Sequence, residues 1–195
     1  MKPLVELKPL KISCTDSDCD NDLHCFKATR QMGREERGSC RSCGAKLIDW
    51  PRLHKRSIED AEFTFEALRN EKIRHHFFHV EIDQRAKNYA KRKGWLKLRE
   101  AVESRIRKYV AKAGNPRDGR QTPFEDNPIF YAQHATATCC RTCLNYWHDI
   151  SKDHDLTDEE VDYCADLIEM YLRERLDDVE DGPQRVPPIR SKITG

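Results

Sequence analysis

Four cysteines near the N-terminus have the spacing of a metal site. Cys14 and Cys19 form one pair, and Cys40 and Cys43 form a second pair that Gly44 follows directly. Two pairs of thiolates separated in this way are typical of a zinc ribbon, in which both pairs bind one tetrahedral ion. Because four protein ligands leave no open coordination position, we expect this Zn²⁺ to be structural.

The ligand set of this first cluster has alternatives. His24 and Cys25 lie between the two pairs, and either could replace one of the four cysteines. Free buried thiols without a metal are the other alternative. The segment has few apolar runs, however, and so needs something besides a hydrophobic core to fold.

A second group of ligands lies in the other half of the chain, where Cys139, Cys140 and Cys143 stand between His134 and His148. Residues three or four apart share one side of a helix. His134, Cys140, Cys143 and His148 could therefore form a zinc site with two cysteines and two histidines, in which Cys139 could replace one member. A buried Cys-rich helix without a metal is the alternative.

The same region could instead be catalytic. Zinc with three protein ligands activates a bound water, and Cys139 could act as a nucleophile beside a histidine. His75 and His79 share a helix face by their spacing, although hydrogen-bonded structural histidines are the simpler interpretation. A metal- or Cys-assisted hydrolase of nucleic acid or nucleotides, such as a nuclease or a base-removing enzyme, would draw its site from His75, His79, Asp118, Arg120, Gln121, His134 and Cys139.

Helices must position most of these side chains, so we predict a mostly α fold, a small helical domain with an N-terminal zinc-ribbon module. Helices are expected over five segments, namely 58–72, 73–93, 95–112, 129–148 and 157–176, and apolar residues recur at helical spacing in the first, third and last of them. Gly94 separates the segment 73–93 from the segment 95–112. Thr157 and Glu160 form a capping box at the start of the segment 157–176. The predicted organisation is a zinc-ribbon-like module over 1–57 that begins with an edge strand or arm at 1–11, a helical domain over 58–176 and a flexible tail over 177–195.

The charges are segregated along the chain. Lys plus Arg number 35 and Asp plus Glu number 34, for a net charge of +1. Yet residues 85–120 hold 13 basic and 3 acidic residues, a net +10, whereas residues 149–182 hold 14 acidic and 3 basic residues, a net −11. The basic stretch either contacts a polyanion or pairs with the acidic helix of its own chain.

The favoured function is therefore that of a cytoplasmic, zinc-dependent nucleic-acid-binding protein. Cations would bind phosphates, while Trp95, and Tyr89 beside it, would stack on bases. The predicted contact residues are Lys91, Arg92, Lys93, Trp95, Arg105 and Lys108. A protein-binding adaptor in phage–host conflict, with the acidic helix 157–176 as its contact surface, is a third hypothesis.

Composition excludes several classes. No apolar run approaches the roughly 18 residues of a membrane span, and the N-terminus lacks the apolar core of a secretory signal. Nine cysteines without such a signal favour thiols and metal over disulfides. Three tryptophans and the apolar helix stripes argue against disorder throughout.

Three motifs carry a resemblance to a known family. They are DGRQTP at 118–123, QHATATCCRTC at 133–143 and WH at 147–148. The chain resembles a bacterial and phage domain of unknown function over about residues 73–176. The resemblance implies a compact, mostly helical domain to which the N-terminal cysteine module is an addition, and it supplies no reaction or substrate.

Overall fold

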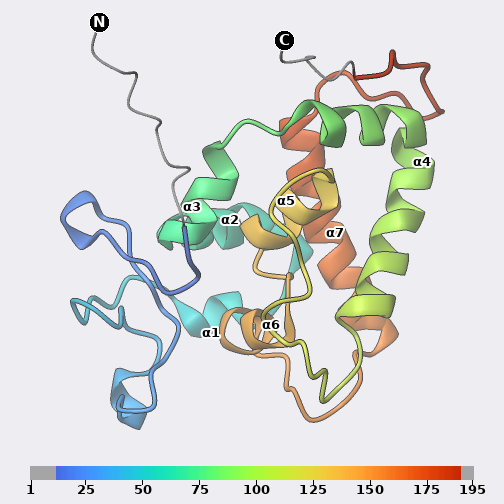
Figure 1. Cartoon of the computed structure of the whole chain (residues 1–195). Helices are drawn as coiled ribbons and strands as arrows, with labels where there is room; N and C mark the ends of the chain where they lie inside the picture. Colours follow the sequence, from blue (N-terminus) through green and yellow to red (C-terminus); the bar gives the residue numbers. More distant parts are fainter. Residues whose placement is uncertain (1–11, 190–195) are drawn as a thin grey trace, which may run out of the picture.

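The computed structural model describes residues 12–189, and these residues are mostly helical (Figure 1). The predicted arm at 1–11 and the end of the predicted tail lie outside them. In chain order the α-helices are α1 (Trp50–Leu53), α2 (Ala61–Arg69), α3 (Lys72–His79), α4 (Gln84–Tyr109), α5 (Pro128–Ala135), α6 (Arg141–His148) and α7 (Asp158–Arg175). The predicted mostly helical fold is confirmed.

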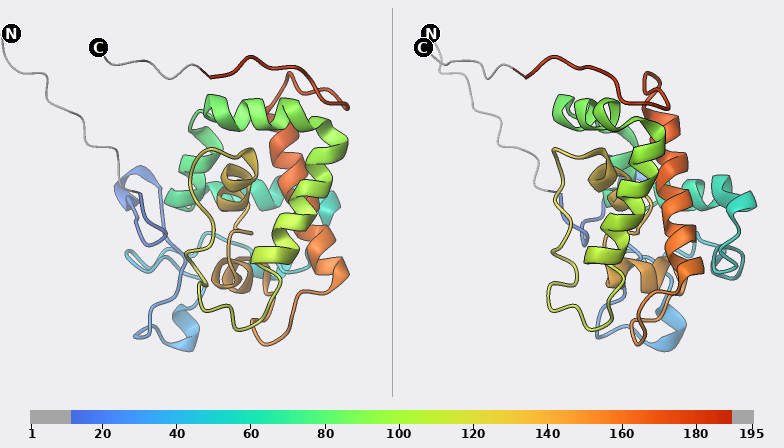
Figure 2. Two further views of the ribbon diagram at one scale, coloured as in Figure 1. Left: turned by 45° about the vertical axis from the view of Figure 1, so that its right-hand side comes forward. Right: turned by 90° about the vertical axis from the view of Figure 1, so that its right-hand side faces the viewer.

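The core of the molecule forms where α4 packs along α7, and α5 lies against α3, α4 and α7 (Figures 1 and 2). Leu98, Val102 and Ile106 form the predicted apolar stripe of α4, and all three are buried. The capping box of α7 is also present, because Thr157 Oγ1 accepts from Glu160 N at 3.2 Å. Within residues 12–189, none of the helices is both long and apolar enough to span a membrane.

The predicted helix 73–93 is two helices. α3 ends at His79, and α4 starts afresh because the Asp83 side chain accepts a hydrogen bond from Ala86 N at 2.9 Å and caps its N-terminus. The sequence pattern is apolar on both sides of this break, so periodicity alone did not reveal it.

Gly94 forms the predicted break as a kink within α4, at φ +67°. The segment after α7 returns to this kink, where Trp95 N donates to Glu180 O at 2.9 Å and Gln184 N donates to Lys91 O at 2.8 Å. A Cβ atom at Gly94 would lie 2.5 Å from the backbone of Asp181 and Gly182. The first part of the predicted flexible tail is thus hydrogen-bonded to α4 (Figure 2).

The Cys-rich segment before α1 consists of loops, short 3₁₀ turns and isolated β-bridges. Among the described residues it lacks the strands that a zinc ribbon would have. Phe26 packs edge-on against Trp50 and Trp147, with ring centroids 6.0 and 5.8 Å away. The Cys-rich segment therefore shares a core with the helices, and a domain boundary near residue 57 stays a prediction.

Candidate metal centres and a basic groove

The first cluster gathers three cysteines and one histidine. The ligand atoms of Cys19, His24, Cys40 and Cys43 all lie within 4.8 Å of one another. Cys19 Sγ is 3.8 Å from Cys40 Sγ, and Cys43 Sγ is 3.4 Å from His24 Nδ1. This is the alternative set in which His24 takes the place of Cys14. The group could hold a metal ion, and three thiolates with one imidazole suit Zn²⁺.

Local backbone geometry positions these ligands. Gly44, at φ +76°, lets the chain turn so that its N–H donates to Cys40 O at 2.8 Å. Burial opposes ionisation of the Cys40 thiol, but hydrogen bonds from the backbone at Cys25, Cys43 and Ser42 lower its pKa to about 6. Cys40 is therefore a thiolate near neutral pH, which is the form that binds metals.

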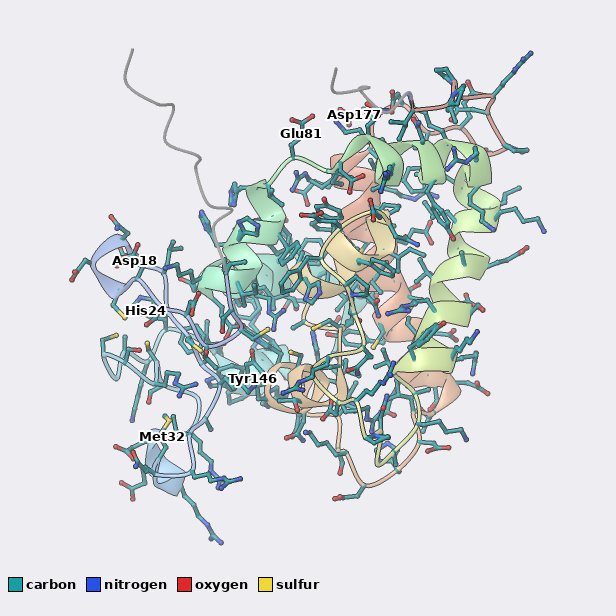
Figure 3. All side chains as sticks on the ribbon, viewed as in Figure 1. Asp18, His24, Met32, Glu81, Tyr146 and Asp177 are labelled. Carbon is teal, nitrogen blue, oxygen red and sulfur yellow. The ribbon has the colours of Figure 1, made fainter. Side chains whose placement is uncertain are left out.

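The first cluster is tied to the helical domain through the backbone of His24, which Figure 3 labels on the Cys-rich segment. His24 N donates to Asn70 O at 2.8 Å, and Lys72 N donates to His24 O at 2.9 Å. These two hydrogen bonds flank Glu71 and hold the metal-ligand loop against the start of α3.

The second cluster consists of Cys139, Cys140 and Cys143, all of them buried, with sulfurs within 4.8 Å of one another. The predicted continuous helix over 129–148 is wrong at this point. α5 ends at Ala135, and Ala137 has a positive φ of 56°. Cys140 caps α6 instead, because its Sγ accepts from Cys143 N at 3.4 Å. Cys139, on the connecting loop, is thereby brought beside Cys143, with 3.5 Å between their sulfurs.

A fully buried ion pair lies against these thiols. Arg74 Nη2 is 3.1 Å from Cys143 Sγ, and Arg74 Nε donates to Glu71 Oε2 at 3.0 Å. Hydrogen bonds from Cys139 and Cys140, together with the charge of Arg74, hold the pKa of Cys143 well below its usual range. Hydrogen bonds to Cys140 and Cys143, with burial, raise the pKa of Cys139 well above it.

His148 cannot complete the second cluster as predicted. Its Nε2 lies 2.9 Å from Thr136 O, and its Nδ1 lies 3.0 Å from Tyr163 Oη. Nε2 must donate to the carbonyl, so Nδ1 accepts from the hydroxyl, and no lone pair is free for a metal. His148 has a structural role, and burial lowers its pKa to about 4.

A groove of about 570 Å³ runs along α4 and over the start of α5. It is lined by four cations, Lys93, Lys97, Arg105 and Lys108, and by three aromatic rings, Tyr89, Tyr109 and Phe130. One carboxylate, Glu100, also lines it and pairs with Lys97 at 3.1 Å. Arg105 is held between two of these rings, with its guanidinium carbon 4.0 Å from the Tyr109 centroid and 4.8 Å from the Phe130 centroid.

Three of the predicted nucleic-acid contacts line this groove, namely Lys93, Arg105 and Lys108. Arg92 is exposed outside it. Lys91 instead pairs with Asp178 at 2.5 Å. Trp95 is 9% exposed, and Arg173 covers its ring at 4.4 Å. The prediction that Trp95 stacks on bases is therefore wrong, because the ring is buried and Arg173 covers it.

Comparison with known families places the chain in a family. A sequence model described as "Domain of unknown function (DUF4186)" matches residues 62–173, which is more than half of the chain. The chain belongs to the DUF4186 family. No solved structure matches the chain. The DUF4186 match contains the second cluster and the groove, whereas the first cluster precedes it.

The DUF4186 domain distributes the predicted catalytic residues over separate places. His75 and His79 stack on each other on α3, with ring centroids 4.1 Å apart. Asp118 Oδ1 accepts a hydrogen bond from Thr142 N at 3.2 Å in the first turn of α6, and Asp118 also pairs with Lys152.

The remaining predicted catalytic residues also have separate surroundings. Arg120 is exposed, and Gln121 Oε1 accepts from Arg120 N at 3.0 Å. Cys139 is buried with a raised pKa, which is the opposite of an activated nucleophile. Across residues 12–189, no hydrogen bond or ion pair joins the His75–His79 pair to any other of these groups.

Sequence reasoning missed Glu71 and, in the groove of the DUF4186 domain, Tyr109 and Phe130. The Glu71 carboxylate accepts from Tyr146 Oη at 2.9 Å and from Trp147 Nε1 at 2.8 Å. No sequence signal marks Glu71, because it sits in a run of charged residues typical of a solvated surface.

Proposed function

We propose that the chain is a zinc-dependent nucleic-acid-binding protein whose contact surface is the groove along α4. The observation that carries the proposal is the combination of cations and aromatic rings within that one concave surface. Cations supply the affinity for phosphate, and rings stack on unpaired bases of any sequence.

Three of the four cations of the groove, Lys93, Arg105 and Lys108, are available for phosphate. Lys93 and Lys108 form no ion pair with a carboxylate anywhere in residues 12–189, and each lies over a tyrosine ring instead. Arg105 donates to Gln121 O at 2.6 Å, which fixes its guanidinium without neutralising its charge. The other side of α4 differs, because Arg99 pairs with Asp166 and Glu169 of α7.

The two sides of α4 therefore fit both interpretations of the basic stretch, namely contact with a polyanion and pairing with the acidic helix of the same chain. Cations that face α7 are compensated by the chain's own acidic residues. In the groove Lys97 pairs with Glu100, and Lys93, Arg105 and Lys108 remain for a polyanion. The acidic helix is correspondingly less available as a partner surface, since Asp158 also pairs with Arg107. This pairing favours nucleic acid over the adaptor hypothesis.

Zinc would have a structural role in this proposal. The first cluster stabilises the loops that pack on Trp147, and the second borders the connection between α5 and α6. Four protein ligands at the first cluster leave no position for a reacting water. The proposed role of zinc is therefore to hold the scaffold that presents the groove.

Binding of fluorescently labelled single-stranded oligonucleotides tests the proposal, with anisotropy measured across salt concentrations. We expect measurable affinity at low salt, and we expect Lys93→Gln and Lys108→Gln each to lower the salt slope by roughly one. Lys55→Gln is the matched control, because Lys55 is exposed on another surface of the chain.

The aromatic part of the proposal needs a separate variant. Tyr109→Ser removes a ring that is 39% exposed, so its cost to stability should be small. We expect it to weaken single-strand binding by about 1–3 kcal/mol and to leave duplex binding less affected. Absence of binding at low salt, or binding that salt does not change, would refute the proposal.

A further inference from the structure

We infer that His134 joins Cys139, Cys140 and Cys143 as the fourth ligand of a second, closed zinc site inside the helical domain. This inference goes beyond the proposed function and does not depend on nucleic-acid binding. It also replaces the ligand set that spacing alone favoured, which contained His148 and left out Cys139.

The three thiols already have the arrangement of a metal half-site. Cys140 and Cys143 are three apart at the N-terminus of α6, where a backbone N–H donates to the Cys140 sulfur. The Cys139 sulfur lies 3.5 Å from the Cys143 sulfur. Sulfurs are weak hydrogen-bonding partners, so thiol–thiol contacts alone give little reason to bury three of them together.

His134 has the hydrogen bonding of a metal-binding histidine. It is 4% exposed, and its Nε2 lies 3.1 Å from Pro123 O and 3.2 Å from Thr122 O. Nε2 must carry the proton that these carbonyls accept, which leaves a lone pair on Nδ1. That Nδ1 is buried and finds no hydrogen-bond partner in the described part of the chain. A ring nitrogen that donates to a carbonyl while the other stays free is the usual state of a histidine ligand.

Arg74 links the backbone of His134 to the thiols. The ring nitrogens of His134 do not lie within 4.8 Å of all three sulfurs, so metal binding would have to draw the imidazole toward them. Arg74 Nη1 donates to the His134 backbone oxygen at 2.6 Å, and its Nη2 reaches Cys143 Sγ at 3.1 Å. One guanidinium therefore contacts both the histidine and the cysteine cluster. The Phe77 ring, stacked on the His134 ring with centroids 4.8 Å apart, holds the imidazole in this region.

Cys14 is the competing fourth ligand, because the charges of Arg74 and Cys143 both act on its thiol. The net charge buried at the site decides between Cys14 and His134 as the fourth ligand. Three thiolates, Zn²⁺, Arg74⁺ and Glu71⁻ sum to −1, and a neutral imidazole leaves that sum unchanged. A fourth thiolate would make it −2, and each uncompensated buried charge costs several kcal/mol. The neutral ligand His134 is therefore favoured.

Metal content and cobalt spectra of the full chain test the inference. Wild type, purified under reducing conditions, should carry two zinc ions per chain, one for each cluster. His134→Ala should carry one. His134→Cys should regain the second metal and, loaded with Co²⁺, show stronger sulfur-to-cobalt charge transfer than wild type, since a thiolate replaces the imidazole.

Two further variants make the test specific. Cys14→Ser should keep both metals. His79→Ala, which removes an exposed histidine of α3, controls for the loss of a histidine as such. The rescue by His134→Cys separates a ligand role from simple misfolding, because a misfolded domain would not recover metal.

Three results would overturn the inference. One is a single zinc ion in wild type. Another is loss of the second metal in Cys14→Ser with retention in His134→Ala. The third is a disulfide within the cluster in reduced preparations, detected by mass spectrometry after alkylation. None of these results bears on the groove, so the failure of this inference is distinguishable from failure of the proposed function.

Discussion

Replacement of Glu71 by glutamine should strongly destabilise this protein, although the side chain keeps nearly the same size. The carboxylate is fully buried and accepts from four donors: Arg74 Nε at 3.0 Å, Tyr146 Oη at 2.9 Å, Trp147 Nε1 at 2.8 Å and Phe26 N at 3.2 Å. It thus joins the first-cluster loop, α3 and α6 at one point.

The magnitude follows from what the amide cannot do. A glutamine offers one acceptor oxygen, and its NH₂ group would face donors, so at least one buried donor is left unsatisfied at about 1–3 kcal/mol. Arg74 would also lose its only carboxylate partner among the described residues, and breaking a buried ion pair costs about 3–5 kcal/mol. Because these costs overlap, we expect a loss of about 4 kcal/mol.

Urea denaturation of the zinc-loaded protein, followed by tryptophan fluorescence, measures this loss. With a slope of about 2 kcal/mol per M, the midpoint should fall by about 2 M. Glu100→Gln is the matched control, since Glu100 forms an exposed pair with Lys97 that is worth about 0.5 kcal/mol or less. A loss below about 1 kcal/mol for Glu71→Gln would refute the assignment of this network as a structural centre.

Three further predictions follow from single sites. Gly94→Ala should cost at least about 1 kcal/mol more in urea denaturation than Gly114→Ala, since both glycines have positive φ but only Gly94 touches backbone; equal costs would contradict the contact. Burial lowers the pKa of His148 from 6.5 to about 4, so its contribution is complete above pH 6.5 and is lost as the pH falls toward 4, about 3 kcal/mol in all. His148→Gln should flatten that part of the stability–pH curve, and an unchanged curve would disprove the assignment. His24→Ala should lower the zinc content by one ion because its Nδ1 belongs to the first cluster, and full retention would point back to Cys14.

The sequence by itself determined that the fold is mostly helical and where chemistry gathers, although it did not show the breaks at 80–83 and 136–140. Short-range patterns sufficed for this, because helix periodicity, the Thr157 capping box and the Gly94 break depend on neighbours a few residues away. Metal-ligand spacing is equally local, and it located both cysteine clusters. The break between α5 and α6, just before Cys140, lies within the segment that the ligand spacing had singled out.

Only the tertiary structure decided which members of each cluster act together. His24 enters the first cluster because its backbone pairs with residues that flank Glu71, and His148 leaves the second because Tyr163 and Thr136 occupy its nitrogens. Trp95 and Lys91 turn away from the groove because α7 and the segment after it cover that side of α4. Each of these outcomes depends on contacts between residues far apart in sequence, for which a one-dimensional pattern contains no signal.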